Sequence, residues 1–296
     1  MTMKSKVSIV KASYDNIYRN LSKAIDLVGG LDIADKKKIV IKVNLCDARP
    51  PSTGAITHPK FLDAVLRYLR ENFNELEIYV VESDARMVLA DLYIRWFGLL
   101  SVMEKWGAKW CNLSKDKVVK KKINGLYFKE IDFPQVFEDC YFITLPKLKT
   151  NILTKMTCCL KNQFGCLTTV NKARYHRWIH DVIVDVNKTF KPDFCIVDGI
   201  ISMVGCKGPA FGMPVKSELL LAGKDPVAVD TVCAKIMGFR PSTIGYIRKA
   251  EKVGIGSMTC EIVSEINPLP RIDSKWSKVE LLMLKLASYL QKRASK

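Results

Sequence analysis

The sequence predicts an α/β protein: a doubly wound, largely parallel sheet with helices on both faces and two lobes around a polar crevice. The first observation is that short runs rich in valine and isoleucine alternate with helical patterns, as in consecutive βαβ units. The second is that the longest apolar runs have the length of strands, and 296 residues with 48% hydrophobic content can bury a sizeable core.

Each predicted element follows from its local pattern. Strands are predicted where β-branched residues cluster, at residues 6–11, 37–45, 75–83, 140–146, 193–199 and 217–223. Helices are predicted where apolar residues recur every three or four positions, at residues 16–30, 60–72, 181–190 and 225–238. Pro59 suits a first helical turn, and Asp225 is the expected N-cap of the last helix. The basic run 115–122 predicts an edge strand or an exposed hairpin.

We expect residues 1–270 to form one α/β domain, with an N-terminal lobe of about 1–145 and a C-terminal lobe of about 146–270. Residues 271–296 predict a basic amphipathic helix that packs on the domain, with membrane or RNA contact as alternatives. The chain contains no apolar run long enough for a transmembrane segment, and it starts without a signal-peptide pattern. We therefore expect a cytoplasmic protein.

The chain is strongly basic, with 47 Lys and Arg against 30 Asp and Glu and a net charge of +17. Such a balance favours polyanionic partners or phosphorylated small molecules, and it also predicts weak, non-specific binding of nucleic acid. A plain solvated basic surface is the alternative. Neither RRM nor KH signatures appear, so an RNA role would depend on charge alone.

Polar residues follow several predicted strands, where the ligand crevice of an open α/β sheet lies. Lys42 and Asn44 follow the second strand, and the fourth strand leads into Lys147 and Lys149. Asp198 follows a later strand. Helix caps and solvent contacts would explain any one of these residues, but their concurrence predicts a binding site.

The segment that leaves the fourth strand, residues 145–166, holds four lysines and no acidic residue. Lys161, Asn151 and Asn162 belong to it. A basic surface loop is one interpretation, and an anion pocket is the other. Gly205, Gly208 and Gly212 would let backbone approach a ligand closely, but their spacing matches neither a Walker nor a dinucleotide fingerprint.

Histidines and cysteines were candidates for metal ligands. His176 and His180 are four residues apart, so on one helix they would share a face, as a zinc or iron pair does; a basic surface helix is the alternative. We retain His180, or His176, as a phosphate contact or general base. The cysteines match no zinc or cluster spacing, although Cys46, Cys159, Cys166 and Cys206 could converge. We expect no stoichiometric zinc or iron.

The residues resemble the domain of unknown function 362 family over roughly residues 20 to 256. The motifs are LVGGL, IVIKVNL, THP, VVESDA, LPKLKTN, CLKNQFG, KPDFCIVDGI, GPAFGMP, AGKDPVAVD and GIG. The resemblance implies no settled activity. It implies a shared constellation at Lys42, Asn44, Thr57, His58, Lys147, Lys149, Lys161, Asn162, Asp198, Gly208, Pro209, Gly212, Asp225 and Asp230.

The chain departs from the family pattern at three places: Asn151 replaces a usual histidine, Cys158 stands near a usual glycine, and Val204 stands near a usual glutamate. Some relatives carry a ferredoxin-like cluster domain, whose cysteine run is missing from this sequence. These departures weaken any inference of shared acid–base or metal chemistry.

The sequence therefore predicts a protein that binds, and acts on, an anionic carboxylate or phosphate in a lysine-rich crevice. Lys147, Lys149 and Lys161 would neutralise the ligand, and Asn44 and Asn162 would orient it. Proton transfer would fall to Asp198, His58 or His180. The cofactor is unknown. The alternatives are a non-catalytic RNA- or ribosome-associated protein and an iron–sulfur or thiol redox protein.

Overall fold

The structure is a computed structural model that describes residues 4–33, 35–205, 211–274, 282 and 286. The strands in these ranges are β1 Ser5–Lys11, β2 Lys38–Lys42, β3 Glu77–Glu82, β4 Lys109–Asn112, β5 Val118–Lys122, β6 Glu130–Pro134, β7 Tyr141–Thr144, β8 Lys147–Asn151, β9 Lys155–Thr157, β10 Phe194–Val204, β11 Met213–Gly223 and β12 Cys260–Ser264. The α-helices are α1 Ile17–Asp26, α2 Pro59–Asn72, α3 Ala90–Trp96, α4 Leu99–Lys105, α5 Cys159–Asn162, α6 Ile179–Thr189, α7 Pro226–Ile236 and α8 Gly245–Lys252. Short 3-10 helices are η1 Pro51–Thr53, η2 Gln135–Phe137, η3 Gln163–Cys166, η4 Lys172–Trp178 and η5 Pro241–Thr243.

One large mixed sheet runs through the protein in the order β12-β1-β11-β10-β7-β2-β3-β4, and β8 and β9 extend it beside β10. Most strand pairs are parallel; β11 is antiparallel to both β1 and β10, and β9 is antiparallel to β8. The predicted α/β class with a largely parallel sheet is confirmed.

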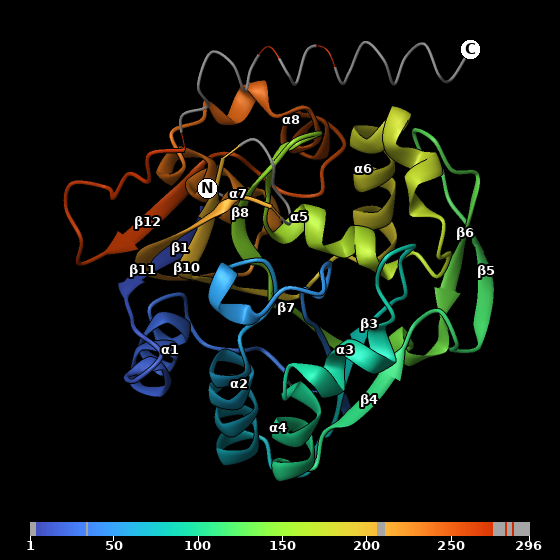
Figure 1. Ribbon diagram of the computed structural model, residues 1–296, viewed down its shortest axis with the longest axis horizontal. Helices are drawn as coiled ribbons and strands as arrows, with labels where there is room; N and C mark the ends of the chain where they lie inside the picture. Colours follow the sequence, from blue (N-terminus) through green and yellow to red (C-terminus); the bar gives the residue numbers. More distant parts are fainter. Residues whose placement is uncertain (1–3, 34, 206–210, 275–281, 283–285, 287–296) are drawn as a thin grey trace.

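Helices cover both faces of the sheet because alternate side chains of each strand point to opposite faces. In β2, Ile39 and Ile41 pack into the core beneath α1, α2 and α4, whereas Val40 packs into the core beneath α6, α7 and α8. Figure 1 shows these two groups of helices on opposite sides of the sheet. The two-sided arrangement is the one that the alternating sequence pattern predicts.

Two residues separate the end of β7 from the start of β8, and the chain changes its pairing partner between the two strands. Leu145 N still donates to Lys42 O, but after Pro146 the chain leaves β2 and pairs with β10 on one side, with Lys147 opposite Asp198, and with β9 on the other. We expected these lysines in a segment leaving a strand; they lie in a strand whose five residues are all buried. The correction has a simple cause: the long β10 has room for a second partner beyond β7.

The basic run 115–122 forms a hairpin, as predicted: β5 pairs with β6 in a separate two-stranded sheet, and every residue of β5 is exposed. The division into lobes near residue 145 stays a prediction. Most of the predicted C-terminal helix, and Cys206, Gly208 and Pro209, lie outside the described residues. Within the described ranges, no helix is both long and apolar enough to cross a membrane.

Candidate functional site

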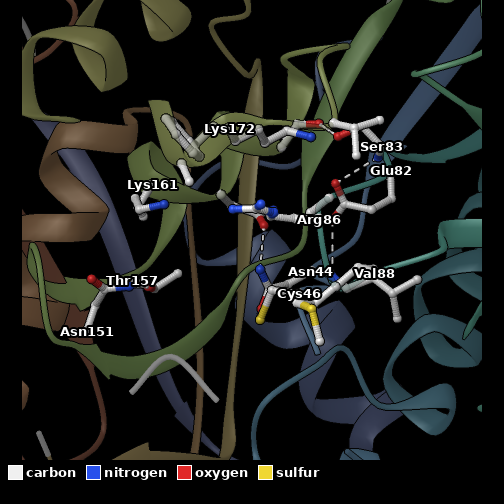
Figure 2. A pocket seen from close by; sticks show the side chains of 18 of the residues that line it. Asn44, Cys46, Glu82, Ser83, Arg86, Val88, Asn151, Thr157, Lys161 and Lys172 are labelled. Atoms are coloured by element: carbon white, nitrogen blue, oxygen red, sulfur yellow. Dashed lines mark hydrogen bonds between the residues drawn. The ribbon is translucent and has the colours of Figure 1, made fainter. Parts of the chain in front are cut away.

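A cavity of about 280 Å³ opens where the ends of β2, β3 and β8 meet α5 and η4. Figure 2 shows Lys161, Arg86 and Lys172 around this cavity together with Asn44, Cys46 and Glu82. Its lining includes both polar and apolar side chains. The residues that line it are Asn44, Leu45, Cys46, Glu82, Ser83, Ala85, Arg86, Met87, Val88, Lys149, Asn151, Thr157, Lys161, Asn162, Phe164, Gly165, Val170, Lys172, Ala173 and His176.

The two predicted asparagines meet in this cavity. Asn44 Nδ2 donates to Asn162 Oδ1 over 3.0 Å, and Asn162 Nδ2 donates to Thr144 Oγ1 and to Lys42 O. Thr57 fixes Asn44 from below, because its hydroxyl accepts from Asn44 N at 2.8 Å. These buried hydrogen bonds hold both side-chain amides in one orientation. A fixed orientation is needed if the amides are to orient a ligand.

Lys149 reaches the cavity from β8 with its ammonium group fully engaged. Nζ donates to Asn44 Oδ1 at 2.7 Å, to Ala55 O at 2.5 Å and to Cys46 Sγ at 3.0 Å. No carboxylate is among these partners. Three acceptors use the three donors of an ammonium group, so Lys149 contributes positive charge to the cavity but no spare N–H.

Lys42 lies behind the cavity wall in a buried ion pair with Glu82, Nζ to Oε2 at 2.7 Å. Glu82 also accepts from the backbone N–H of Leu45 and Ser83. Gly165 passes directly over this pair: a Cβ at Gly165 would lie 2.6 Å from Lys42 Nζ. Glu82 is therefore neutralised before any ligand arrives.

Three further cations face the cavity with donors to spare. Lys172 Nζ donates to Asp84 O at 2.5 Å, which leaves two of its donors unused. Arg86 is exposed, and Lys161 Nζ lies 4.1 Å from the centre of the Phe164 ring; neither pairs with a carboxylate of the described residues. Burial, foremost, lowers the pKa of Lys161 and of Lys172 to about 8.

The balance of charge in the cavity is strongly positive. Four cationic side chains line it, and the only carboxylate among the lining residues is Glu82. Glu82 is bound to Lys42, a fifth cation. Like charges in a partly desolvated space repel, so the arrangement favours an anion.

A second polar group lies outside the cavity lining, around Asp198. Lys147 Nζ lies 3.0 Å from Asp198 Oδ2, and both side chains are fully buried. The Tyr14 hydroxyl lies 3.1 Å from each carboxylate oxygen of Asp198. Burial lowers the pKa of Lys147, and the attraction of Asp198 opposes that effect; burial and then Asp198 raise the pKa of Tyr14.

His58 belongs to this second group. Its ring stacks on Tyr14 with centroids 3.8 Å apart, and its Nδ1 accepts from Lys60 N at the start of α2. Burial lowers the pKa of His58 to about 4, with smaller contributions from Asp198, which raises it, and Lys147, which lowers it. The imidazole is therefore neutral near pH 7, and one of its nitrogens is already used as a helix cap.

Known proteins resemble this chain over most of its length. The model of the family described as domain of unknown function (DUF362) matches residues 39–235, which include every residue that lines the cavity and, of the second group, His58, Lys147 and Asp198 but not Tyr14. The chain belongs to the DUF362 family. A thylakoid-associated protein from Synechocystis sp. is 26% identical over 302 residues, covering 95% of this chain and 90% of that protein. No solved structure matches the chain.

The remaining predicted residues of this DUF362 protein lie elsewhere. Asp225 caps α7 and also accepts from Ser257 N, so its carboxylate holds the fold together. Gly212 packs against Met203, where a Cβ would lie 2.5 Å from Cγ. Neither residue lines the cavity, and Gly208 lies outside the described residues.

The expectation that His176 and His180 share a face of one helix is wrong. His176 lies in η4 and lines the cavity, whereas His180 lies in the first turn of α6 and stacks toward Tyr246, centroids 6.1 Å apart. A 3-10 helix ends at Trp178, which changes the rotation per residue between the two histidines. Burial, foremost, lowers the pKa of both.

Of the four cysteines that could converge, the three that the structure describes, Cys46, Cys159 and Cys166, do not form one metal-binding group. Cys46 lines the cavity, while Cys158 and Cys159 are buried with Asp230 in the core, their sulfurs 3.9 Å apart. Asp230 accepts from the backbone N–H of Cys159 and Leu160 and thereby caps α5. We assign this cluster to the packing of the core, because a buried free cysteine usually behaves as a small apolar side chain.

Sequence reasoning missed three residues of the two polar groups. Arg86 and Lys172 line the cavity, and Tyr14 binds Asp198. Arg86 directly follows the VVESDA motif, which is a usable signal because the residues after a strand face the crevice. Tyr14 carried the same signal, since it stands three residues after the predicted strand 6–11, whereas Lys172 follows no predicted strand.

Proposed function

We propose that this DUF362 protein binds an anionic small molecule, a carboxylate or a phosphate, in the cavity between β2, β3, β8 and η4, and acts on it chemically. The observation that carries the proposal is the excess of cations: Arg86, Lys149, Lys161 and Lys172 line the cavity against one neutralised carboxylate. Arg86 suits planar, bidentate recognition of a carboxylate or phosphate.

Each predicted lysine has a specific role in this proposal. Lys149 supplies charge and positions Asn44, whereas Lys161 and Lys172 are able to contact the ligand. Lys42 keeps Glu82 neutralised. Lys147 and Asp198 lie outside the cavity lining, so we do not assign them to ligand contact. Their ion pair instead holds β8 against β10, and Asp198 accepts a hydrogen bond from the Tyr14 hydroxyl.

The burial of these lysines favours a small ligand over RNA. Lys42, Lys147 and Lys149 are fully buried, so no duplex or single strand can reach them from outside. The exposed hairpin carries the charge that RNA would need, but Lys120 is paired with Asp132 at 2.7 Å and Lys115 with Asp91 at 2.5 Å. These pairs reduce the net positive field of the hairpin.

We further propose that the protein is cytoplasmic. Nine cysteines of the described residues are free thiols, as is usual in a reducing compartment. The related Synechocystis protein is thylakoid-associated, and a basic surface that meets an anionic membrane would give such an association without a membrane-spanning helix.

A thermal-shift series tests the proposal. Phosphate, sulfate and pyruvate are titrated into protein kept in an amine buffer, because an anion that binds the folded state raises its stability by about 2.7 kcal/mol at a hundredfold excess over Kd. We expect the melting temperature to rise with at least one anion. Changing Arg86→Gln together with Lys161→Met should abolish the rise.

Lys117→Met together with Lys122→Met is the matched control, since both are exposed lysines on the hairpin side and their loss changes the net charge by the same two units as the Arg86 and Lys161 changes. This control should keep the full anion effect. An anion effect that survives the Arg86 and Lys161 changes, or that disappears equally in the control, assigns the stabilisation to the general surface charge and rejects the cavity.

A further inference from the structure

Lys161 differs from the other lysines around the cavity in having no polar partner within the described ranges of the chain. Lys149 has three acceptors, Lys42 has Glu82 and Lys172 has the carbonyl of Asp84. Lys161 Nζ instead lies over the ring of Phe164.

The surroundings of Lys161 favour its neutral amine. Burial is the largest influence, and the positive charges of Lys149, Lys42 and Lys172 add to it, while Cys46 opposes them; together they lower its pKa to about 8. About a tenth of Lys161 is therefore uncharged at pH 7, against well under about a thousandth for an ordinary lysine. The other charged or titratable groups around the cavity are Glu82, Arg86 and His176.

A desolvated lysine among other cations is the usual form of a nucleophilic lysine. We propose that Lys161 is a covalent site: its Nζ condenses with the carbonyl carbon of a 2-oxo acid bound in the cavity and forms an imine. This inference rests on the proposed anion-binding function and adds the class of ligand, a carboxylate that carries a neighbouring carbonyl group.

The step balances without an oxidant or a metal. The Nζ lone pair forms the C–N bond while the carbonyl π pair moves to oxygen, and a proton passes from nitrogen to that oxygen, giving a carbinolamine. The hydroxyl then leaves as water with one proton taken from solvent, and the C=N bond of the protonated imine forms. His176 lines the same cavity, and because burial lowers the pKa of its imidazole, the neutral ring is available to accept a proton and return it.

The cavity lining offers partners for both the carboxylate and the apolar part of such a ligand. Arg86 and Lys172 have unused donors for the carboxylate. The lining also includes apolar side chains that would pack against the remainder of the acid: Met87, Val88, Phe164 and Val170. At about 280 Å³ the space holds a small metabolite and excludes a polymer.

Reductive trapping tests the assignment. The protein is incubated with pyruvate and sodium cyanoborohydride, which turns an imine into a stable secondary amine, and peptide mass spectrometry locates the added mass. We expect modification of Lys161 to exceed that of any surface lysine by more than about tenfold at pH 7. Labelling should rise with pH through a midpoint of about 8.

Variants and a second ligand make the outcome decisive. Lys161→Met and Lys161→Arg should lose the adduct, Lys161→Arg should keep the thermal shift, and Lys117→Met should retain both. Lactate, which has the same charge but no carbonyl group, should stabilise the protein without forming an adduct. Modification centred on Lys172, or spread evenly over surface lysines, overturns the assignment.

The same experiment separates this inference from the proposed function. If pyruvate and lactate both raise the melting temperature but pyruvate forms no adduct, the cavity binds anions and the covalent role of Lys161 is rejected. If neither acid, nor phosphate or sulfate, changes the melting temperature and no adduct forms, both proposals fail.

Discussion

Lys147 and Asp198 face each other across the β8–β10 pair, Nζ to Oδ2 at 3.0 Å, with neither side chain exposed to solvent. Tyr14 and the backbone N–H of Ile200 satisfy the remaining capacity of the carboxylate. The pair holds β8 in the register that carries Lys149 to the cavity two residues later. Its integrity is thus a condition for the site.

Removing one member of this pair should be costly. Lys147→Met leaves Asp198 as a buried, uncompensated charge, and we expect a loss of about 3–5 kcal/mol in the free energy of unfolding, measured with urea. Adding Asp198→Asn to that variant removes the unpaired charge and should recover part of the loss. A change below about 0.5 kcal/mol for Lys147→Met contradicts this account.

Gly165→Ala should destabilise the protein by about 1–3 kcal/mol, because the new methyl group would overlap Lys42 and the carboxylate of Glu82. Displacing that pair exposes charge at the cavity wall, so the anion-dependent thermal shift should also weaken. Denaturant unfolding measures the first effect and the melting series the second. Wild-type stability in this variant would show that η3 at Gly165 lies too far from the Lys42–Glu82 pair for a methyl group to reach it.

Stability should depend on the charge of His58. Its folded-state pKa of about 4 lies below the ordinary value of 6.5, so between these pH values the unfolded chain binds more protons. Stability is complete above about pH 6.5 and falls as the pH drops toward 4. His58→Asn keeps a cap acceptor and does not titrate, so its unfolding free energy should fall less steeply over this range.

If both proteins lose stability with the same slope between pH 6.5 and 4, His58 contributes nothing to the pH dependence. His176 and His180, whose pKa values are also lowered by burial, would then account for it. The difference between the two slopes is the quantity to measure, because acidic side chains affect both proteins alike.

Nucleic acid should bind weakly and without sequence preference, through exposed lysines such as those of β5. Filter binding across a salt series should show affinity that falls steeply as salt increases, because released counterions drive such binding. Tight binding at high salt, or a strong preference for one RNA, would favour the RNA-associated alternative over the small-molecule proposal.

Purified protein should contain no stoichiometric zinc or iron. His176 and His180 belong to different helices, and the Asp230 carboxylate beside Cys158 and Cys159 is occupied by backbone N–H groups. Elemental analysis measures this directly. One metal ion per chain that disappears on Asp230→Asn would show that the buried thiols form a metal centre.

The sequence by itself determined the class of fold and the chemistry available to the site. A continuous run of isoleucine and valine, as in β2, buries both faces of the strand and so requires helices on both sides of the sheet. Asp225 and Pro59 marked the starts of α7 and α2, since caps depend on neighbours in the chain. Asn44 and Asn162 were predicted as ligand-orienting residues, and both line the cavity.

Only the tertiary structure decided which lysines have partners. Lys42 pairs with Glu82 and Lys147 with Asp198, residues 40 and 51 positions apart in the sequence, while Lys161 pairs with no carboxylate of the described residues. Strand order sets these distances, and no spacing in the sequence encodes it. Identical side chains thus become a neutralised pair, a fixed charge or a reactive amine according to how burial and neighbouring charges change the cost of protonation.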